Sequence, residues 1–181
     1  AFARLDARLI ISARRKERIE ALAQELNRVH DTEVLTIQLD VRNQPAVEKA
    51  VHDLPANWKD IDVLVNNAGL SRGLDKLYEG KLEDWEEMID TNIKGLLYVS
   101  RAVIPGMVTR GKGTIINIGS MAGHEVYPGG NVYCATKFAV DALTRGLRHD
   151  LVETPIRVCT VDPGLVETEF SVVRFRGNDQ R

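Results

Sequence analysis

Residues 9–39 read LIISARRKERIEALAQELNRVHDTEVLTIQL, and this stretch decides the fold. It begins with a short apolar run, Leu9–Ser12, and ends with a second one that is rich in β-branched residues, Val34–Leu39. Between them, in Lys16–His30, apolar residues recur at a spacing of three and four, as on a helix with one buried face. The stretch therefore predicts two parallel strands joined by a crossover helix.

The same alternation continues along the chain. Further strands are predicted at Ile61–Asn66, Thr114–Ile118 and Ile156–Val161, and further helices at Pro45–Leu54, Asp84–Thr109 and Val132–Val152. The strands are short apolar or β-branched runs, so we expect both of their faces to be buried. The predicted fold is α/β, a doubly wound parallel sheet of the Rossmann type, in which ligands bind at the carboxyl ends of the strands.

The composition is that of an average folded domain. The 181 residues are 44% hydrophobic and 28% charged, which suffices for one core, and we expect a single domain over residues 1–181. The net charge of −2 supplies no field that would attract nucleic acid or an anionic membrane, and no apolar run approaches the length of a membrane span. The two cysteines lie far apart without metal-ligand spacing, so a reducing compartment, the cytoplasm, fits best.

Both ends of the sequence are expected to be incomplete. Residues 1–7 are typical of the end of a helix that leads into the first visible strand, so a preceding strand and turn are expected. After Phe170, no segment predicts a strand or helix strong enough to close the other edge of the sheet. The sequence is therefore interpreted as a fragment.

A basic loop, Ser12-Ala13-Arg14-Arg15-Lys16-Glu17-Arg18, follows the first strand and opens a helix. Cations at a helix N-terminus are repelled by the positive end of the helix dipole, which destabilises the helix unless a bound anion compensates for them. In a dinucleotide site, this place holds an acidic residue for a ribose 2′-hydroxyl or an arginine for a 2′-phosphate, and Ala13 followed by Arg14 favours the phosphate. Taken alone, the loop fits a solvated basic turn equally well.

Short side chains end the next two strands. Asp40-Val41 closes the second strand, and Asn66-Asn67-Ala68-Gly69 closes the third. Such residues let a ligand approach the backbone, and Asp40 can accept a hydrogen bond from an adenine amino group. An Asx turn at Asp40 and a strand-end turn at Gly69 are the alternatives without a ligand, and for Asp40 alone the turn is favoured.

Tyr133 and Lys137 form a Tyr-x-x-x-Lys pair, which on a helix places both side chains on one face. An ammonium beside a phenol lowers the pKa of the phenol, so the pair is predicted to exchange a proton near neutral pH. Such a spacing arises by chance in about one chain in six, so the pair indicates a catalytic site only together with other residues of the same motif set. Ser120, just after the fourth strand, can hold a substrate carbonyl oxygen. Asn92 interrupts an apolar helix face, where a helix kink is the alternative.

Together these residues resemble the short-chain dehydrogenase/reductase family. The motifs stand in the family's order and spacing over nearly the whole chain: Asn66-Asn67-Ala68-Gly69, Asn92, Ser120, Tyr133, Lys137 and Asp162-Pro163-Gly164…Thr168. Within the family, the sequence looks closest to the NADP-dependent 3-hydroxy acid dehydrogenases, also called serine or allo-threonine dehydrogenases. Three segments carry this narrower likeness: Asp84-Trp85-Glu86…Met88-Ile89-Asp90-Thr91-Asn92, Gly129-Gly130-Asn131-Val132-Tyr133 and Thr168-Glu169-Phe170…Val173-Arg174-Phe175.

The resemblance implies an enzyme that transfers hydride between NADP and the 3-hydroxyl or 3-keto carbon of a small hydroxy acid. Tyr133 would be the general acid/base, and Lys137 would lower its pKa and hold the nicotinamide ribose. Ser120 would orient the substrate oxygen, and Asn92 would anchor a proton-relay water. The other implied cofactor contacts are Arg14 and Arg15 at the 2′-phosphate, Asp40 and Val41 at the adenine, Asn67, Ala68 and Gly69 at the adenosine side, and Pro163, Gly164, Val166 and Thr168 at the nicotinamide. Family members pair through long helices, so a homodimer or homotetramer is implied.

One feature of the family is missing from the sequence. The glycine-rich phosphate turn is not found, since the earliest glycine is Gly69. The alternatives are a carbonyl reductase for bulkier ketones, an epimerase or dehydratase of the extended branch, and a non-catalytic cofactor-binding regulator. For the substrate carboxylate, Arg174 is the candidate, with pairing to Glu167 or Glu169 as the alternative. No metal is predicted, because the four histidines, His30, His52, His124 and His149, lack partners at ligand spacing.

Overall fold

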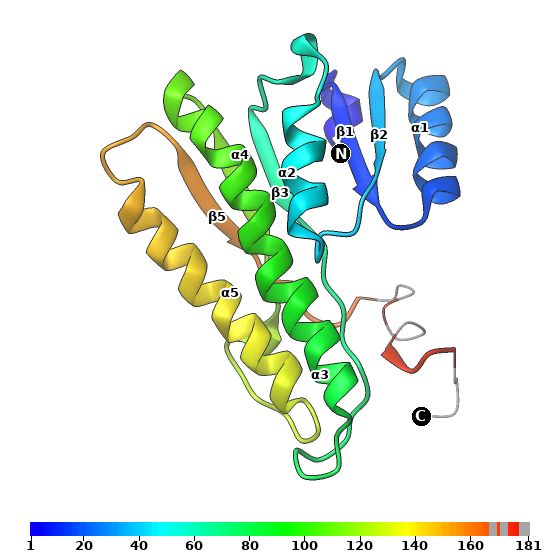
Figure 1. Cartoon of the computed structure of the whole chain (residues 1–181), viewed down its shortest axis with the longest axis vertical. Helices are drawn as coiled ribbons and strands as arrows, with labels where there is room; N and C mark the ends of the chain where they lie inside the picture. Colours follow the sequence, from blue (N-terminus) through cyan, green and yellow to red (C-terminus); the bar gives the residue numbers. More distant parts are fainter. Residues whose placement is uncertain (167–169, 171–173, 178–181) are drawn as a thin grey trace.

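The chain folds as alternating strands and helices (Figure 1), in a computed structural model that describes residues 1–166, 170 and 174–177. The strands are β1 (Leu9–Ala13), β2 (Val34–Gln38), β3 (Val63–Asn66), β4 (Thr114–Ile118) and β5 (Arg157–Val161). The longer helices are α1 (Lys16–His30), α2 (Gln44–His52), α3 (Leu82–Ile89), α4 (Leu96–Arg110) and α5 (Asn131–Asp150). Short helical turns are η1 (Phe2–Leu5), η2 (Ala56–Trp58), η3 (Asp90–Gly95) and η4 (Met121–Gly123). The predicted elements are confirmed, with ends that shift by at most two residues.

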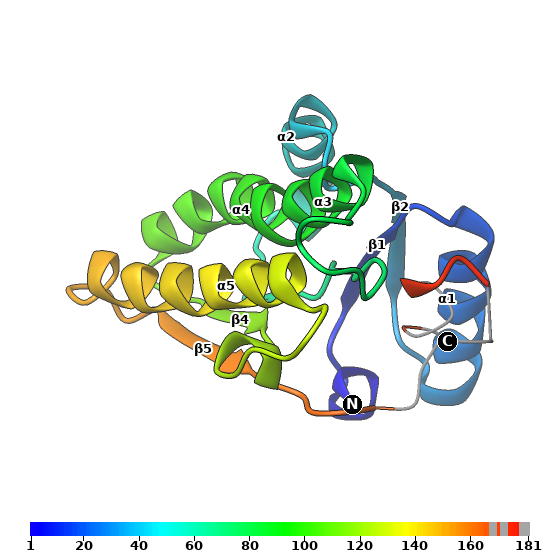
Figure 2. The ribbon, with the colours of Figure 1, turned by 90° about the horizontal axis from the view of Figure 1, so that it is seen from below.

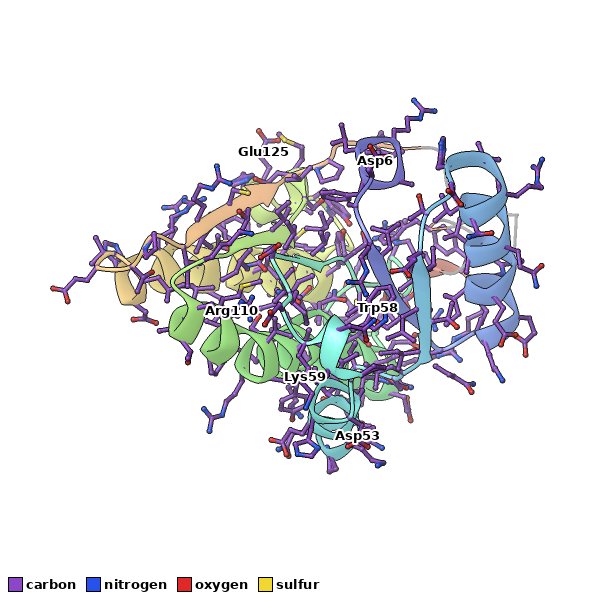
Figure 3. The ribbon with its side chains drawn as sticks, turned by 90° about the horizontal axis from the view of Figure 1, so that it is seen from above. Asp6, Asp53, Trp58, Lys59, Arg110 and Glu125 are labelled. Carbon is purple, nitrogen blue, oxygen red and sulfur yellow. The ribbon has the colours of Figure 1, made fainter. Side chains whose placement is uncertain are left out.

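All strand pairs are parallel, which confirms the predicted α/β class. β1 pairs with β2, and β3, β4 and β5 form a second sheet with β4 in the middle. Within the described residues, β1 and β3 do not pair, so the strands form two sheets rather than the single one expected. A cation–π contact joins the segment before β1 to the segment before β3. The Arg8 guanidinium lies over the Trp58 ring, 4.2 Å from its centroid, and Figure 3 labels Trp58 beside β1.

Burial of both strand faces was expected, and this is wrong for β3. Its residues alternate, with Leu64 and Asn66 buried while Val63 and Val65 are 40% and 38% exposed. The cause is the placement of the helices: Figure 2 shows α4 and α5 together on one side of β4 and β5, whereas α1 packs on β1 and β2. In the described part of the chain, the three-stranded sheet thus has one well-covered face.

The helix predicted at Asp84–Thr109 is continuous but irregular. α3 passes into α4 through the π-helical turn η3, and the combined rod runs beside α5 (Figure 1). The alternative reading of Asn92 was a helix kink, and the structure has a π-helical turn at this place. Gly95 ends the turn where the helix comes closest to the loop after β2, since a Cβ there would lie 2.6 Å from Val41 Cγ2. Asn92 lies within this π turn, and its side chain is buried.

The core under the three-stranded sheet is apolar, and a row of hydrogen-bonded polar side chains lies beside it. Leu64, Val103, Met107, Ile115, Leu151 and Ile156 form the apolar part. Beside it, Asn66 Nδ2 donates to Asn117 Oδ1 at 2.8 Å, and Asn117 Nδ2 donates to Thr144 Oγ1 at 2.8 Å. These buried bonds join β3, β4 and α5, and they fix the strand ends that carry the candidate site.

Candidate active site

Ser120, Tyr133 and Lys137 lie together where β4 ends against the first turns of α5. Ser120 is the N-cap of η4, and its Oγ accepts a hydrogen bond from the Ala122 N–H at 3.1 Å. Gly123 brings this turn onto the helix, because a Cβ there would stand 2.8 Å from the Lys137 carbonyl oxygen. A glycine is needed for that approach, and it places the Ser120 hydroxyl in front of α5.

The Tyr133 hydroxyl is buried and hydrogen-bonded. The residue is 8% exposed, and burial raises the pKa of the phenol above its ordinary value of 10.0, while a hydrogen bond with Ser120 offsets part of that rise. Tyr133 therefore carries its proton at neutral pH and can donate it to a neighbouring oxygen.

Lys137 lies one helical turn further on and is also buried. Its Nζ donates to the Ile118 carbonyl oxygen at 2.9 Å and lies 5.9 Å from the centroid of the Tyr133 ring. Burial lowers the pKa of the ammonium to about 8. The sequence predicted that this ammonium lowers the pKa of Tyr133, and this is wrong, because Lys137 is directed at the end of β4 and desolvation of the phenol dominates.

Asn92 is 2% exposed, and both its amide oxygen and its amide nitrogen are hydrogen-bonded. Its Oδ1 accepts from the Leu70 N–H and its Nδ2 donates to the Leu70 carbonyl, both at 2.8 Å, and Nδ2 also donates to Thr136 Oγ1 at 2.9 Å. Both amide protons are thereby used. The side chain locks the loop after β3 to α5, and its role with a relay water stays a prediction.

The loop after β3 passes close to both of these side chains. A Cβ added at Gly69 would lie 3.4 Å from Asn92 Oδ1 and 3.6 Å from Lys137 Nζ. Asn67, Ala68 and Gly69 are themselves exposed, so this backbone is open to a ligand. On the other side, the Pro163 carbonyl accepts from the Met121 N–H at 3.1 Å, which joins the loop after β5 to the same site.

The remaining predicted contacts of the loop after β5 are only partly described. Pro163 is half-buried, whereas Gly164 and Val166 are exposed. Thr168 lies outside the described residues, so the structure gives no placement for it. The predicted nicotinamide contacts in this loop stay predictions.

The predicted adenine and phosphate residues lie at the ends of β1 and β2. Asp40 forms the Asx turn that was the alternative, since its Oδ1 accepts from the Arg42 N–H at 3.0 Å. The Arg42 guanidinium also binds both carboxylate oxygens and holds the pKa of Asp40 below its usual value. The Arg14 side chain is exposed, with Nη1 3.6 Å from Glu87 Oε1, and Arg15 is the N-cap of α1. The two arginines do follow the first strand at a helix start, as expected.

Arg174 reaches the neighbourhood of Tyr133 from the chain beyond Phe170. Its Nε donates to the Gly73 carbonyl at 2.9 Å and its Nη2 donates to the Tyr127 hydroxyl at 3.0 Å. The guanidinium carbon lies 5.9 Å from the Tyr133 ring centroid. The alternative pairing with Glu167 or Glu169 is not tested, because both lie outside the described residues.

Three residues of the site were given no role from the sequence: Thr136, Tyr127 and Asp162, of which Asp162 stood only within the Asp162-Pro163-Gly164 motif. Thr136 Oγ1 donates to the Tyr133 carbonyl at 2.7 Å and accepts from Asn92, so it links the two. The sequence feature that could have indicated Thr136 is its position, a small hydroxyl residue between Tyr133 and Lys137 on the same helix. Asp162 Oδ2 accepts from Thr160 Oγ1 at 2.9 Å, and its charge partly counters the burial of Lys137. No local pattern marks Tyr127.

Within the described residues, no three His, Cys, Asp or Glu side chains gather as metal ligands. In the same part of the chain, no helix combines the length and apolar character that a membrane crossing requires.

Comparisons with known proteins agree on one family. Residues 1–178 match the family model described as short chain dehydrogenase. The NADP-dependent 3-hydroxy acid dehydrogenase YdfG of Salmonella typhimurium is 55% identical over 175 residues, which are 96% of this chain and 69% of the relative. A protein of the same description from Schizosaccharomyces pombe is 46% identical over 96% of this chain and 67% of its own length.

Solved structures show the same likeness. The closed form of a serine dehydrogenase complexed with NADP+ superposes with a TM-score of 0.94 at 50% identity, covering 98% of this chain and 71% of the other. Serine dehydrogenase from Escherichia coli gives a TM-score of 0.86 at 49% identity, over 91% of this chain and 73% of the other.

Proposed function

Because the chain belongs to the short-chain dehydrogenase family, we propose that it is an NADP-dependent oxidoreductase acting on the 3-hydroxyl or 3-keto carbon of a small hydroxy acid. The observation that carries the proposal is the buried, protonated Tyr133 hydroxyl, hydrogen-bonded to Ser120 and followed one turn later by Lys137. The relatives described as NADP-dependent 3-hydroxy acid dehydrogenases and as serine dehydrogenase support the choice of cofactor and substrate class.

The residues present fit a bound NADP. The open backbone of Asn67, Ala68 and Gly69 lies beside Lys137 Nζ, which leaves room and a donor for a ribose. Arg14 offers a cation for a 2′-phosphate, because it has no carboxylate closer than 3.6 Å in the described chain. Arg15, Asp40, Val41, Pro163, Gly164, Val166 and Thr168 complete the proposed cofactor contacts.

The nicotinamide supplies the hydride when the cofactor is bound, so the protein has to position the carbon and move one proton. Tyr133 donates its proton to the substrate oxygen in the reducing direction and takes it back in the oxidising direction. Ser120 holds the same oxygen, since its hydroxyl already faces Tyr133. Lys137 holds a ribose by its ammonium. Asn92 holds the Leu70 loop, and its Oδ1, which accepts one of the two hydrogen bonds open to an amide oxygen, is the atom proposed to anchor the relay water.

A small carboxylate substrate matches the surroundings of Tyr133. Arg174 lies beside its ring, and an arginine can bind a carboxylate through two parallel hydrogen bonds. A cavity lined in part by Trp85, Met88 and Val132 lies next to Tyr133.

The wider setting follows from the same proposal. Residues 1–181 act as a single dinucleotide-binding domain, and two or four copies associate through the long α4 and α5 helices, as the family resemblance implies. The cytoplasm is the proposed location, consistent with two cysteines that are both unpaired in the described chain. A monomeric mass in sedimentation at micromolar concentration would argue against the association.

The experiment compares Tyr133→Phe with Tyr98→Phe, a matched loss of a hydroxyl on α4. Tyr133→Phe should lose turnover by about 10²–10⁴-fold while NADP binding, measured by calorimetry, stays nearly unchanged, because only the proton-transferring group is removed. Tyr98→Phe should keep both. Retention of more than about one per cent of the activity by Tyr133→Phe would show that Tyr133 is not the acid.

A further inference from the structure

Three arginines from three successive strand-end loops converge on one carboxylate of α3. Arg14 follows β1, Arg42 follows β2 and Arg72 follows β3. Arg72 Nε lies 2.7 Å from Glu87 Oε2, and Arg72 Nη2 donates to Oε1 at 3.1 Å. Arg14 Nη1 and Arg42 Nη1 lie 3.6 Å and 3.7 Å from the same Oε1. Glu87 therefore stands between one close partner and two distant ones.

The close contact of Glu87 with Arg72 and its distant contacts with Arg14 and Arg42 differ in how many guanidinium N–H donors they leave available to a ligand. The Arg72 fork is closed on Glu87, and its side chain is 12% exposed. Arg14 and Arg42 lie beyond hydrogen-bond distance from Glu87, and their side chains are 49% and 34% exposed. Glu87 thus attracts these two guanidinium groups without saturating their donors.

Arg42 is further oriented by Asp40. Its Nε and Nη2 bind the Asp40 carboxylate, which leaves Nη1 directed toward Glu87 and Arg14. The Nη1 atoms of Arg14 and Arg42 consequently share one neighbourhood at the carboxyl ends of β1 and β2. Parallel α/β sheets bind ligands at that edge.

We propose that Arg42 is a further binding residue for the 2′-phosphate of NADP, beside Arg14 and Arg15, and that Glu87 is an internal counter-ion that holds the Arg14 and Arg42 guanidinium groups in place and limits their affinity for the phosphate. The inference rests on the proposed function, because it assigns residues to a phosphate that only NADP carries.

The physical reason lies in the charges. Two guanidinium groups directed at one point repel each other, and the Glu87 carboxylate relieves this repulsion before a ligand arrives. Hydrogen bonding to Arg72 holds the pKa of Glu87 below its usual value, so the carboxylate is charged at neutral pH. A phosphate offers closer, charge-assisted bonds to Arg14 and Arg42 than Glu87 does, but it also meets the negative charge of Glu87.

Calorimetric titration of the protein with 2′,5′-ADP and with 5′-AMP separates these effects, because the two ligands differ only in the 2′-phosphate. Arg42→Gln should weaken 2′,5′-ADP binding by about tenfold or more, the size of one charge-assisted bond, and change 5′-AMP binding less than about twofold. Arg42→Lys, which keeps the charge without the fork, should fall between the wild type and Arg42→Gln. Glu87→Gln should strengthen 2′,5′-ADP binding about threefold or more. Arg145→Gln, which removes an exposed pair with Asp141 on α5, is the matched control and should leave both ligands unchanged.

Three results would overturn the inference. Equal weakening of both ligands by Arg42→Gln would show that Arg42 acts only by holding Asp40. Unchanged or weaker 2′,5′-ADP binding in Glu87→Gln would show that Glu87 does not restrain the site. If the wild type bound 2′,5′-ADP no more tightly than 5′-AMP, the proposed NADP dependence would fail, and the phosphate role of Arg42 with it.

Discussion

Replacing Lys137 by methionine should make the protein relatively more stable at neutral pH and less so in alkali. The ammonium is 7% exposed, and its pKa falls to about 8 in the folded state from 10.5 in the unfolded chain. Between these two values the unfolded chain binds more protons than the folded one, so wild-type stability rises with pH across that window. Methionine keeps the unbranched shape of the side chain and removes the titrating group.

The magnitude follows from the shift. A difference of about 2.5 pKa units corresponds to about 3 kcal/mol of unfolding free energy that the charged lysine costs well below pH 8. Loss of the hydrogen bond to the Ile118 carbonyl costs the variant about 1–3 kcal/mol at every pH. Between about pH 7 and about pH 9.5, the wild type should therefore gain about 2 kcal/mol relative to Lys137→Met.

Urea unfolding of both proteins across this pH range measures that difference, and groups common to both proteins cancel in it. The exposed Lys59, labelled in Figure 3, provides the control variant Lys59→Met. A gap between the wild type and Lys137→Met that stays constant within about 0.5 kcal/mol over the range would refute the reasoning. Lys137→Met should at the same time lose turnover, so a stability gain at neutral pH with a loss of activity would indicate a residue kept for function.

Three further predictions concern binding and packing. Arg14→Ala should raise the KM for NADPH far more than that for NADH in steady-state kinetics, because only NADPH carries the 2′-phosphate; equal effects would contradict the assignment. Arg174→Met should lower kcat/KM for 3-hydroxy acids and spare neutral alcohols, and a uniform loss in the same substrate panel would indicate a structural arginine. Gly123→Ala should destabilise the protein by about 1–3 kcal/mol in thermal unfolding, because its Cβ would stand 2.8 Å from the Lys137 carbonyl oxygen; unchanged stability would show that the turn can move away.

The sequence predicted the elements well because local periodicity determines them. Lys16–His30 and Thr114–Ile118 begin and end as expected, since polar residues bound one and a glycine pair the other. The π turn at Asn92 could be expected only as an irregularity, because its form depends on contacts with Leu70 and Thr136, which are distant in sequence.

The site was predicted by residue type and spacing, and its electrostatics were not. Spacing on a helix indicated that Tyr133 and Lys137 share a face, but the pKa of each is governed by burial, which a sequence does not display. The contacts of Glu87 with Arg14 and Arg42 were missed for the same reason, because they join α3 to the ends of two strands far away in the chain.

The central claim is that Tyr133 moves the proton of an NADP-dependent oxidation of a 3-hydroxy acid. The most direct measurement follows NADPH formation from serine or 3-hydroxybutyrate with the wild type and with Tyr133→Phe, and repeats it with NAD. The account predicts turnover by the wild type, a clear preference for NADP, and a loss of about 10²–10⁴-fold in Tyr133→Phe. Faster turnover of bulky neutral ketones than of any 3-hydroxy acid, or undiminished turnover in Tyr133→Phe, would contradict it.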